Sequence, residues 1–511
     1  MIGPRRRWLD IVLLALAALA AAAGLAALLP RELPFDDAYI TLQAADRLAH
    51  GGGDPSWRQA AALEGVTSAP HATLVALAGL LLAAPRSAHL VAALALLALV
   101  LGLWRLARSL GTSPAWAAAL TLATILAGEL LPLQIFNGLE TGLAAAAVAW
   151  ALAWAAAPEP PRRALAILCG ALPYLRPDLA GLALALLGLD AWRRAQREAQ
   201  PLWRGAASSL LLAALGATPW ALLYVLQTGA PLPQSGAVKT WFYAGGSLPA
   251  AVKARMVYDN LVFFAPGLFT LGAAFLLLRR VGRAALIGLA AFLGGAFVLF
   301  PQAVGLQQAR YLHAYLPAIA CGWALALAAP AQWLRRLAQA ALPVAILLAA
   351  WHLPETVRLY RANCAFTRRE LAPLAAWMRR QPEDLSPVLV HDAGYLAWAT
   401  RLEMVDLVGL KTPSAARLHH ELTWRSCGAG RAAAVDAIAR AAGVRSFVVL
   451  RSWDTEYRLS DGLRRAGWEL EPLRASAAGY DVYRLTPPAA AASAIPSDRA
   501  AQGSWSSSSP K

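Results

Sequence analysis

The sequence predicts a polytopic α-helical membrane protein that carries a small α/β domain at its C-terminal end. Of the 511 residues, 58% are hydrophobic and only 15% are charged, with a mean hydropathy of +0.48. This composition is too apolar for a soluble globular protein. The formal net charge of +16 comes from short arginine clusters between apolar runs. That pattern is typical of cytoplasmic membrane loops and does not favour a nucleic-acid partner.

About eleven membrane crossings are predicted from the apolar runs, with the N-terminus in the cytoplasm and every arginine cluster on the inner side. The two runs that flank Pro173–Asp178 are short, and one broken helix is an alternative. Two crossings are preferred because only they preserve the positive-inside pattern. The runs are Leu9–Leu29, Ala88–Leu103, Pro114–Leu131, Thr141–Ala157, Ala164–Leu172, Leu179–Leu189, Ala206–Leu226, Leu261–Leu278, Ala284–Phe300, Leu312–Ala329 and Leu337–His352.

The first external loop, residues 30–87, belongs to a predicted membrane domain of residues 1–354. Within this loop, Ala38–His50 has the pattern of an amphipathic helix, and Asp37 is placed to be its N-cap. The stretch His71–Ala84 is apolar but short for a crossing. We therefore expect an interfacial or re-entrant segment there.

The composition changes after His352, and residues 355–487 are predicted to form an extracytoplasmic α/β domain. A helix is expected over Arg369–Arg380, and strands over Val388–His391, Ser446–Leu450 and Asp481–Leu485. Because no glycine fingerprint follows a strand, a nucleotide site is not supported. The Ala/Ser/Pro-rich tail, residues 488–511, is expected to be disordered.

An acidic pair, Asp36 and Asp37, follows the first apolar run where that helix leaves the lipid. Two adjacent carboxylates at this depth can deprotonate a hydroxyl nucleophile or bind a divalent cation. The alternative is a helix N-cap with an interfacial charge. We predict that Asp37 and Asp36 are catalytic, and we leave the metal open.

Three cations are expected on the same external face, namely Arg176, Lys239 and Arg310. A cation at membrane depth is costly unless it faces an anion or a cavity, and arginine matches phosphate with a planar fork. We assign all three to a lipid-linked phosphate, with interfacial snorkelling as the alternative. Glu140 and Asn137 begin a predicted span on this face and are assigned to sugar binding, although Glu140 also suits a helix N-terminus.

Several motifs follow one another along this face: Asp36-Asp37-Ala38-Tyr39-Ile40, Glu64-Gly65-Val66-Thr67-Ser68, Gly138-Leu139-Glu140-Thr141, Leu175-Arg176-Pro177-Asp178, Ala237-Val238-Lys239 and Arg310-Tyr311-Leu312. In this order they resemble the GT-C superfamily of membrane glycosyltransferases that use polyprenyl-phosphate-linked sugars. The resemblance is greatest to the branch that includes mycobacterial terminal arabinofuranosyltransferases. It implies a GT-C-like fold and an inverting transferase, in which the acid of the first external loop is the base and basic residues hold the donor phosphate. Val66 stands where relatives often have tyrosine, which leaves the acceptor open.

The sequence thus predicts an enzyme of the cytoplasmic membrane, with its C-terminal domain outside, that moves a sugar from a polyprenyl-phosphate carrier to a hydroxyl of an envelope glycan, lipid or protein. A transporter or flippase of lipid-linked sugars is an alternative, although its charges are expected near the bilayer midplane rather than at one face. A noncatalytic assembly factor of the envelope is the other alternative.

Overall fold

The computed structural model describes residues 29–57, 60–199, 201–264, 267–475 and 479–488. All but the last residue of the predicted first crossing, Leu9–Leu29, lies outside these ranges. The predicted tail also lies outside them, apart from its first residue.

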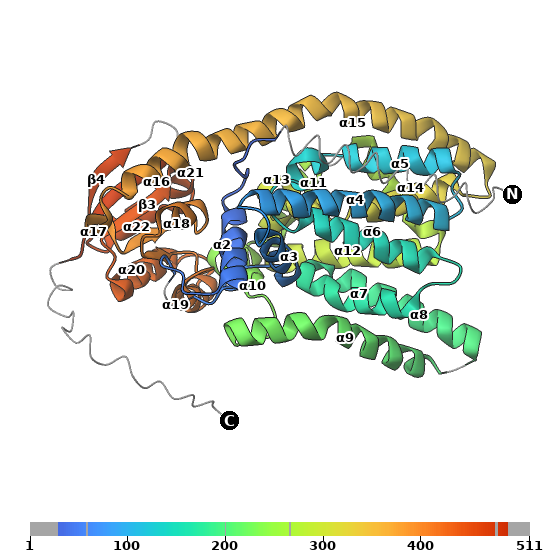
Figure 1. The fold of residues 1–511 in the computed structure, drawn as a ribbon, viewed down its shortest axis with the longest axis horizontal. Coiled ribbons are helices and arrows are strands. Elements are labelled where there is room, and N and C mark those ends of the chain that lie inside the picture. The colour runs from blue at the N-terminus through green and yellow to red at the C-terminus, as the bar shows by residue number, and fades with distance from the viewer. Residues whose placement is uncertain (1–28, 58–59, 200, 265–266, 476–478, 489–511) are drawn as a thin grey trace.

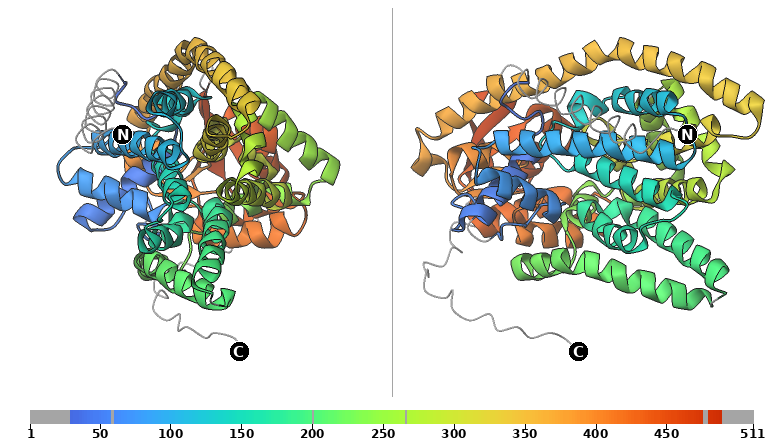
Figure 2. Two further views of the ribbon diagram at one scale, coloured as in Figure 1. Left: turned by 90° about the vertical axis from the view of Figure 1, so that its right-hand side faces the viewer. Right: turned by 45° about the vertical axis from the view of Figure 1, so that its right-hand side comes forward.

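A bundle of long helices forms one half of the molecule, and the C-terminal domain covers one end of it (Figure 1). The end-on view in Figure 2 shows the helices gathered side by side, with the C-terminal domain behind them. The helices of this half are α4 (Arg86–Ser109), α5 (Pro114–Leu126), α6 (Thr141–Ala156), α7 (Arg162–Leu175), α8 (Ala180–Glu198), α9 (Leu202–Thr228), α11 (Ala250–Phe264), η4 (Gly267–Leu278), α12 (Arg280–Leu299), α13 (Leu306–His313), α14 (Leu316–Leu327) and α15 (Gln332–Phe366).

Four helical stretches of the described residues are long and apolar enough to cross a membrane, or five if the bent pair Ala250–Phe263 and Gly267–Leu278 is one span. The shorter apolar helices α5, α6 and α14 each contact α4, and α6 and α14 are largely buried. The predicted count of eleven crossings is therefore not confirmed. The runs around Arg176 form two separate helices, α7 and α8, that contact each other, which agrees with two runs rather than one broken helix.

Proline determines where α7 ends. Arg176 precedes Pro177, and a residue before proline is pushed away from helical angles. Arg176 accordingly adopts φ −159° and ψ 124°, which is extended backbone. The chain turns at this residue, between α7 and α8, and the arginine side chain is fully buried.

The predicted first external loop, residues 30–87, contributes two helices at the junction of the two halves, α2 (Asp37–His50) and α3 (Ala69–Gly79) (Figure 1). The expected N-cap at Asp37 is wrong by one position, because α2 begins at Asp37 and Asp36 precedes it without a side-chain cap hydrogen bond. The reason is that both carboxylates bond to groups outside the helix. Ser68 caps α3 through a hydrogen bond from the His71 amide, 3.3 Å long.

The C-terminal domain contains a five-stranded mixed sheet in the order β2-β1-β3-β5-β4. Strands β1 (Val388–Val390), β3 (Ser446–Leu450) and β5 (Tyr480–Thr486) were predicted, as was the helix around α16 (Ala372–Met378). Strand β2 is only three residues long, and β4 contains Pro472 beside an irregular register, so neither has a clear alternating pattern. The remaining elements are η6 (Thr367–Leu371), α17 (Pro382–Leu385), α18 (Tyr395–Thr400), β2 (Met404–Asp406), α19 (Pro413–Leu418), η7 (His419–Trp424), α20 (Arg431–Ala442), α21 (Arg451–Tyr457), α22 (Leu459–Arg465) and β4 (Glu469–Ala475).

The core of the C-terminal domain extends into the membrane half. Ile40 and Trp57 of the first external loop, Tyr224 of α9 and Phe242 of α10 (Ser235–Tyr243) belong to the same buried cluster as the sheet residues. Burial of this apolar surface away from water stabilises the contact between the C-terminal domain and the helical half. The C-terminal domain is consequently fixed against the loop that carries the acidic pair.

Candidate active site

Asp37 lies at the first turn of α2 and is held by two side chains from distant parts of the chain. The Nζ atom of Lys239 is 2.8 Å from Oδ2 of Asp37, and Nε2 of Gln307 donates to the same oxygen at 2.9 Å. Burial alone raises the pKa of Asp37, but the charges of Lys239 and Arg310 outweigh burial and lower this pKa to about 2. Asp37 is therefore an ionised carboxylate at neutral pH.

Lys239 is presented by α10, a short helix that follows α9. The lysine is 8% exposed. Burial lowers the pKa of Lys239, but the charge of Asp37 outweighs burial and raises this pKa above its ordinary value. The pair is therefore charged on both sides and sits in a largely dry setting, where charges interact more strongly than in water.

Arg310 is presented by α13 through an unusual turn. Gln307, Gln308 and Ala309 have φ values of 51°, 54° and 54°, a left-handed conformation that costs each non-glycine residue of order 1–3 kcal/mol. The amide of Gln134 stabilises this turn by donating to the carbonyls of Gln307 and Gln308 at 3.0 and 3.1 Å. The turn directs Gln307 to Asp37 and places Arg310 inside the bundle.

The guanidinium of Arg310 has spare hydrogen-bonding capacity. Arg310 is 2% exposed, and its Nη2 atom donates to the Tyr311 hydroxyl at 3.0 Å. Within the described part of the chain, its Nε atom has no hydrogen-bond partner and no carboxylate lies within 4.0 Å of it. A buried donor without a partner is costly, and an incoming anion would remove that cost.

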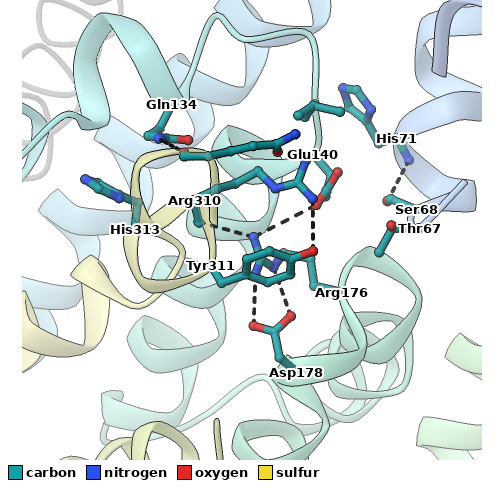
Figure 3. Close-up of polar contacts among 12 residues, drawn as sticks. Thr67, Ser68, His71, Gln134, Glu140, Arg176, Asp178, Arg310, Tyr311 and His313 are labelled. Atoms are coloured by element: carbon teal, nitrogen blue, oxygen red, sulfur yellow. Dashed lines mark hydrogen bonds and ion pairs between the residues drawn. The ribbon is translucent and has the colours of Figure 1, made fainter. Parts of the chain in front are cut away.

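Arg176 is fully engaged, in contrast to Arg310. It pairs with both carboxylate oxygens of Asp178 at 3.1 Å and donates to the Arg310 carbonyl at 3.3 Å. Its guanidinium also lies 4.3 Å from the centre of the Tyr311 ring, and its Nη1 atom is 3.9 Å from Glu140 (Figure 3). Arg176 thus supports the backbone of Arg310 and the ring between the two arginines.

The two residues assigned to sugar binding lie differently from each other. Glu140 is 3% exposed beside the arginines, where their charges outweigh the effect of burial and lower its pKa (Figure 3). Asn137 is fully buried and bonds within its own loop, to Gln134 at 3.2 Å and from the Leu139 amide at 2.8 Å. The structure thus brings Glu140 to the cations, whereas the Asn137 amide is already occupied.

Asp36 faces the C-terminal domain rather than the cations. Its carboxylate accepts the amides of Gly394 at 2.8 Å and Tyr395 at 2.6 Å, at the start of α18. Burial, together with the charge of Asp392, raises the pKa of Asp36 well above its usual value. A Cβ atom on Gly394 would lie 2.0 Å from the Asp36 carbonyl oxygen, so this close contact requires glycine.

Two cavities border α10, and one of them also borders the acidic pair. One has a volume of about 590 Å³ and is bordered by apolar residues of α12 and by residues of α10, together with Asp178 and Tyr311. The other has a volume of about 270 Å³ and lies between Asp36, Asp37, Lys239 and the C-terminal domain. Asp37 and Lys239 therefore border the smaller cavity, whereas other residues of α10 border the larger one.

The described acidic residues do not form a binding site for the divalent cation that the sequence left open. Among the described residues, no three His, Cys, Asp or Glu side chains come together in a way that could hold a metal ion. Asp36, Asp37 and Glu140 each bond in a different direction, to backbone amides, Lys239 and the arginines respectively.

Several residues around Asp37 and Arg310 were not predicted from the sequence to belong to the site. Tyr311 and Gln307 lie beside Arg310 in the chain, and that adjacency was the available signal. His391, Asp392, Trp453 and Tyr480 border the smaller cavity from the C-terminal domain. Nothing in their spacing points to a site more than 350 residues earlier, because only the folded sheet brings them there.

Comparison with solved structures shows that the chain shares its fold with two membrane enzymes. ArnT from Cupriavidus metallidurans bound to undecaprenyl phosphate is 15% identical, with a TM-score of 0.50 over 94% of this chain and 98% of that one. The Archaeoglobus fulgidus oligosaccharyltransferase in complex with zinc and sulfate is 13% identical, with a TM-score of 0.53 over 92% and 73%. At these identities the likeness establishes the fold alone, which is the GT-C-like fold expected from the sequence.

Three further comparisons are less informative. The mycobacterial arabinofuranosyltransferase AftD is 17% identical and covers 94% of this chain and 40% of its own, but its TM-score of 0.42 carries no argument. A family model described as a domain of unknown function, DUF8728, matches residues 358–489. None of the curated proteins compared with the chain matches it.

Proposed function

We propose that this protein is a membrane glycosyltransferase that moves one sugar from a polyprenyl-phosphate carrier to an acceptor hydroxyl. The observation that carries the proposal is an ionised carboxylate, Asp37, paired with Lys239 near the incompletely paired Arg310 on a GT-C-like fold. Asp37 borders the smaller cavity, and α10, which presents Lys239, also borders the larger, apolar one. A base, an anion site, a lipid space and an acceptor space are the parts that such a transfer needs.

The carrier fits the larger cavity. The isoprenoid tail lies against the apolar side chains of α12, where burial contributes roughly 25 cal/mol per Å². The phosphate at its head lies toward Tyr311 and is bound by Arg310 and Lys239. Arg176 acts through Arg310 and Tyr311 as a positioning residue, and Glu140 accepts hydrogen bonds from the sugar.

Transfer then takes place as a single displacement that inverts the anomeric carbon. The acceptor oxygen bonds to that carbon, the bond from the carbon to the phosphate oxygen breaks, and the electron pair of that bond leaves with the phosphate. Asp37 accepts the hydroxyl proton. The leaving phosphate needs no proton because Arg310 and Lys239 stabilise its charge. The products are a glycoside and the polyprenyl phosphate.

The location follows from the same proposal. The protein lies in the cytoplasmic membrane with its N-terminus inside, the site faces the outer surface, and the C-terminal domain is extracytoplasmic. The acceptor is a hydroxyl of an envelope glycan, lipid or protein.

The test is to incubate the purified full chain in liposomes with a panel of polyprenyl-phosphate sugars and to measure sugar release from each carrier. We expect catalytic release from at least one carrier. A chain that only moves carriers between leaflets, without breaking the sugar–phosphate bond, would be a flippase and would contradict the proposal.

A further inference from the structure

The smaller cavity lies where the C-terminal domain meets the acidic pair. It has a volume of about 270 Å³, and its walls carry three carboxylates, Asp36, Asp37 and Asp392, together with aromatic rings. Small-molecule sites usually span about 300–1,000 Å³. The cavity is therefore sized for one small ring rather than for an extended chain.

A buried histidine without a hydrogen bond borders this cavity. His391 is 4% exposed, and within the described ranges neither of its ring nitrogens makes a hydrogen bond. Its Nε2 atom lies 3.1 Å from Oδ2 of Asp392, but the two groups are not oriented for a hydrogen bond. The Oε1 atom of Gln307, which also borders the cavity, is buried and unpartnered as well. Such groups are costly unless a ligand satisfies them.

The aromatic rings give the cavity an apolar wall beside these polar atoms. The ring centre of Trp453 lies 4.8 Å from that of His391, and that of Tyr480 lies 5.9 Å from it. Tyr480 donates its hydroxyl to Asp392. A ligand that matches this wall has an apolar face and a polar edge.

The charges decide against an anionic ligand. Asp37 and Asp392 line the cavity as carboxylates against one lysine, Lys239, which is already paired with Asp37, whereas burial raises the pKa of the third acid, Asp36. A phosphate or carboxylate group entering here would meet like charges, whereas hydroxyl groups can donate to the carboxylates and also hydrogen-bond to His391 and Gln307.

We propose that this cavity binds a neutral sugar unit of a saccharide acceptor, stacked on Trp453 and hydrogen-bonded to His391 and Asp392. This inference rests on the proposed transferase function and deepens it, because it assigns the acceptor class and gives the C-terminal domain a part in binding it. The accepting hydroxyl lies at the Asp37 end of the cavity, within reach of the base.

The test measures binding separately from transfer. The full chain in lipid nanodiscs is titrated, by saturation-transfer NMR, with methyl glycosides of neutral hexoses and pentoses, a hexose 6-phosphate and a blocked serine tripeptide. The same titrations are made with His391→Gln and Trp453→Leu. His50→Gln is the matched control, because the His50 side chain is 59% exposed and lies on α2 away from the cavity lining.

We expect at least one neutral glycoside to bind, and both cavity variants to raise its Kd tenfold or more while His50→Gln leaves it unchanged. The melting temperature of each variant, together with its sugar release from the carrier without acceptor, shows whether the protein is still folded. No binding by any neutral glycoside, tighter binding of the hexose phosphate or the tripeptide, or equal Kd values in the cavity variants would overturn the inference. Glycoside binding without release from any carrier would instead contradict the proposed function.

Discussion

At the scale of single residues, Asp37 differs from Asp36 only in what surrounds it. Asp37 faces Lys239 and Arg310, which hold its pKa at about 2, whereas Asp36 is buried against Asp392 and has a raised pKa. One member of the pair is therefore ionised beside the cations, and the other anchors the start of α18. Divergent surroundings of two acids indicate divergent roles.

This contrast predicts how the pH dependence changes when Lys239 is replaced by methionine. Without the lysine charge, burial dominates and the pKa of Asp37 rises, so the residual activity of Lys239→Met falls on the acidic side at a pH where the native enzyme is still active. The native chain shows no acidic fall from Asp37 above about pH 3, because its pKa is about 2. We also expect kcat/KM of the variant to drop by roughly a hundredfold.

The check is a profile of kcat/KM against pH for sugar release. Lys239→Arg serves as the control because it keeps the charge. Identical profile shapes for the native chain and Lys239→Met would show that the lysine does not set the protonation of Asp37.

Some of the site residues could be predicted from the sequence, and others could not. Asp36, Asp37, Glu140 and Arg310 were identified because they stand at the ends of apolar runs, where a charge needs a reason. The left-handed turn at residues 307–309 contains no glycine, so no local signal marks it. It is maintained by Gln134, more than 170 residues away.

At the scale of elements, α12 forms one wall of the apolar cavity. Gly295 borders that cavity, and neither Gly295 nor its neighbour Gly294 has an atom within 4 Å of a Cβ position. Helix α12 can therefore accept a side chain at either position, but only the one at Gly295 enters the proposed carrier space.

Gly295→Phe is accordingly expected to raise the KM for a long-chain carrier tenfold or more, because the ring occupies volume that the isoprenoid needs. Gly294→Phe is the matched control and is expected to leave the KM near its native value. The measurement is sugar release against carrier concentration for both variants. An equal KM for Gly295→Phe and Gly294→Phe would show that the carrier does not bind in the larger cavity.

The secondary structure was predictable where the pattern is strong and local. Strands β1, β3 and β5 and the helix around α16 follow apolar periodicity. The number of crossings was not settled by hydropathy, because buried helices such as α14 are as apolar as spans although shorter than a bilayer needs.

At the scale of the whole molecule, the two halves meet through a buried lysine. Lys411 of the C-terminal domain is 2% exposed and donates to the Ala62 carbonyl of the first external loop at 3.4 Å. Burial lowers the pKa of Lys411 to about 8, below the roughly 10.4 of a free lysine. The unfolded chain therefore binds more protons between these values, and stability rises with pH from about 8 to 10.

Lys411→Met removes this buried charge and is expected to stabilise the protein at pH 7 by about 1–3 kcal/mol, since a pKa unit corresponds to about 1.4 kcal/mol. The gain is expected to shrink by pH 10, where the native lysine is largely neutral. The gain is measured by thermal unfolding of the native chain and of Lys411→Met in detergent at pH 7 and pH 10. A variant that is less stable than the native chain at pH 7 would mean that the charge contributes favourably to docking.

If Asp37 is the base of a sugar transfer, removing its charge should slow that transfer far more than removing a carboxylate elsewhere on α2. Sugar release from the active polyprenyl-phosphate carrier is measured with acceptor present for the native chain, Asp37→Asn and Asp46→Asn. Asp46 lies on the same helix with its side chain 71% exposed. The account predicts that Asp37→Asn lowers the rate by about 10²- to 10⁴-fold while Asp46→Asn leaves it unchanged. Equal rates for the native chain and Asp37→Asn would contradict it.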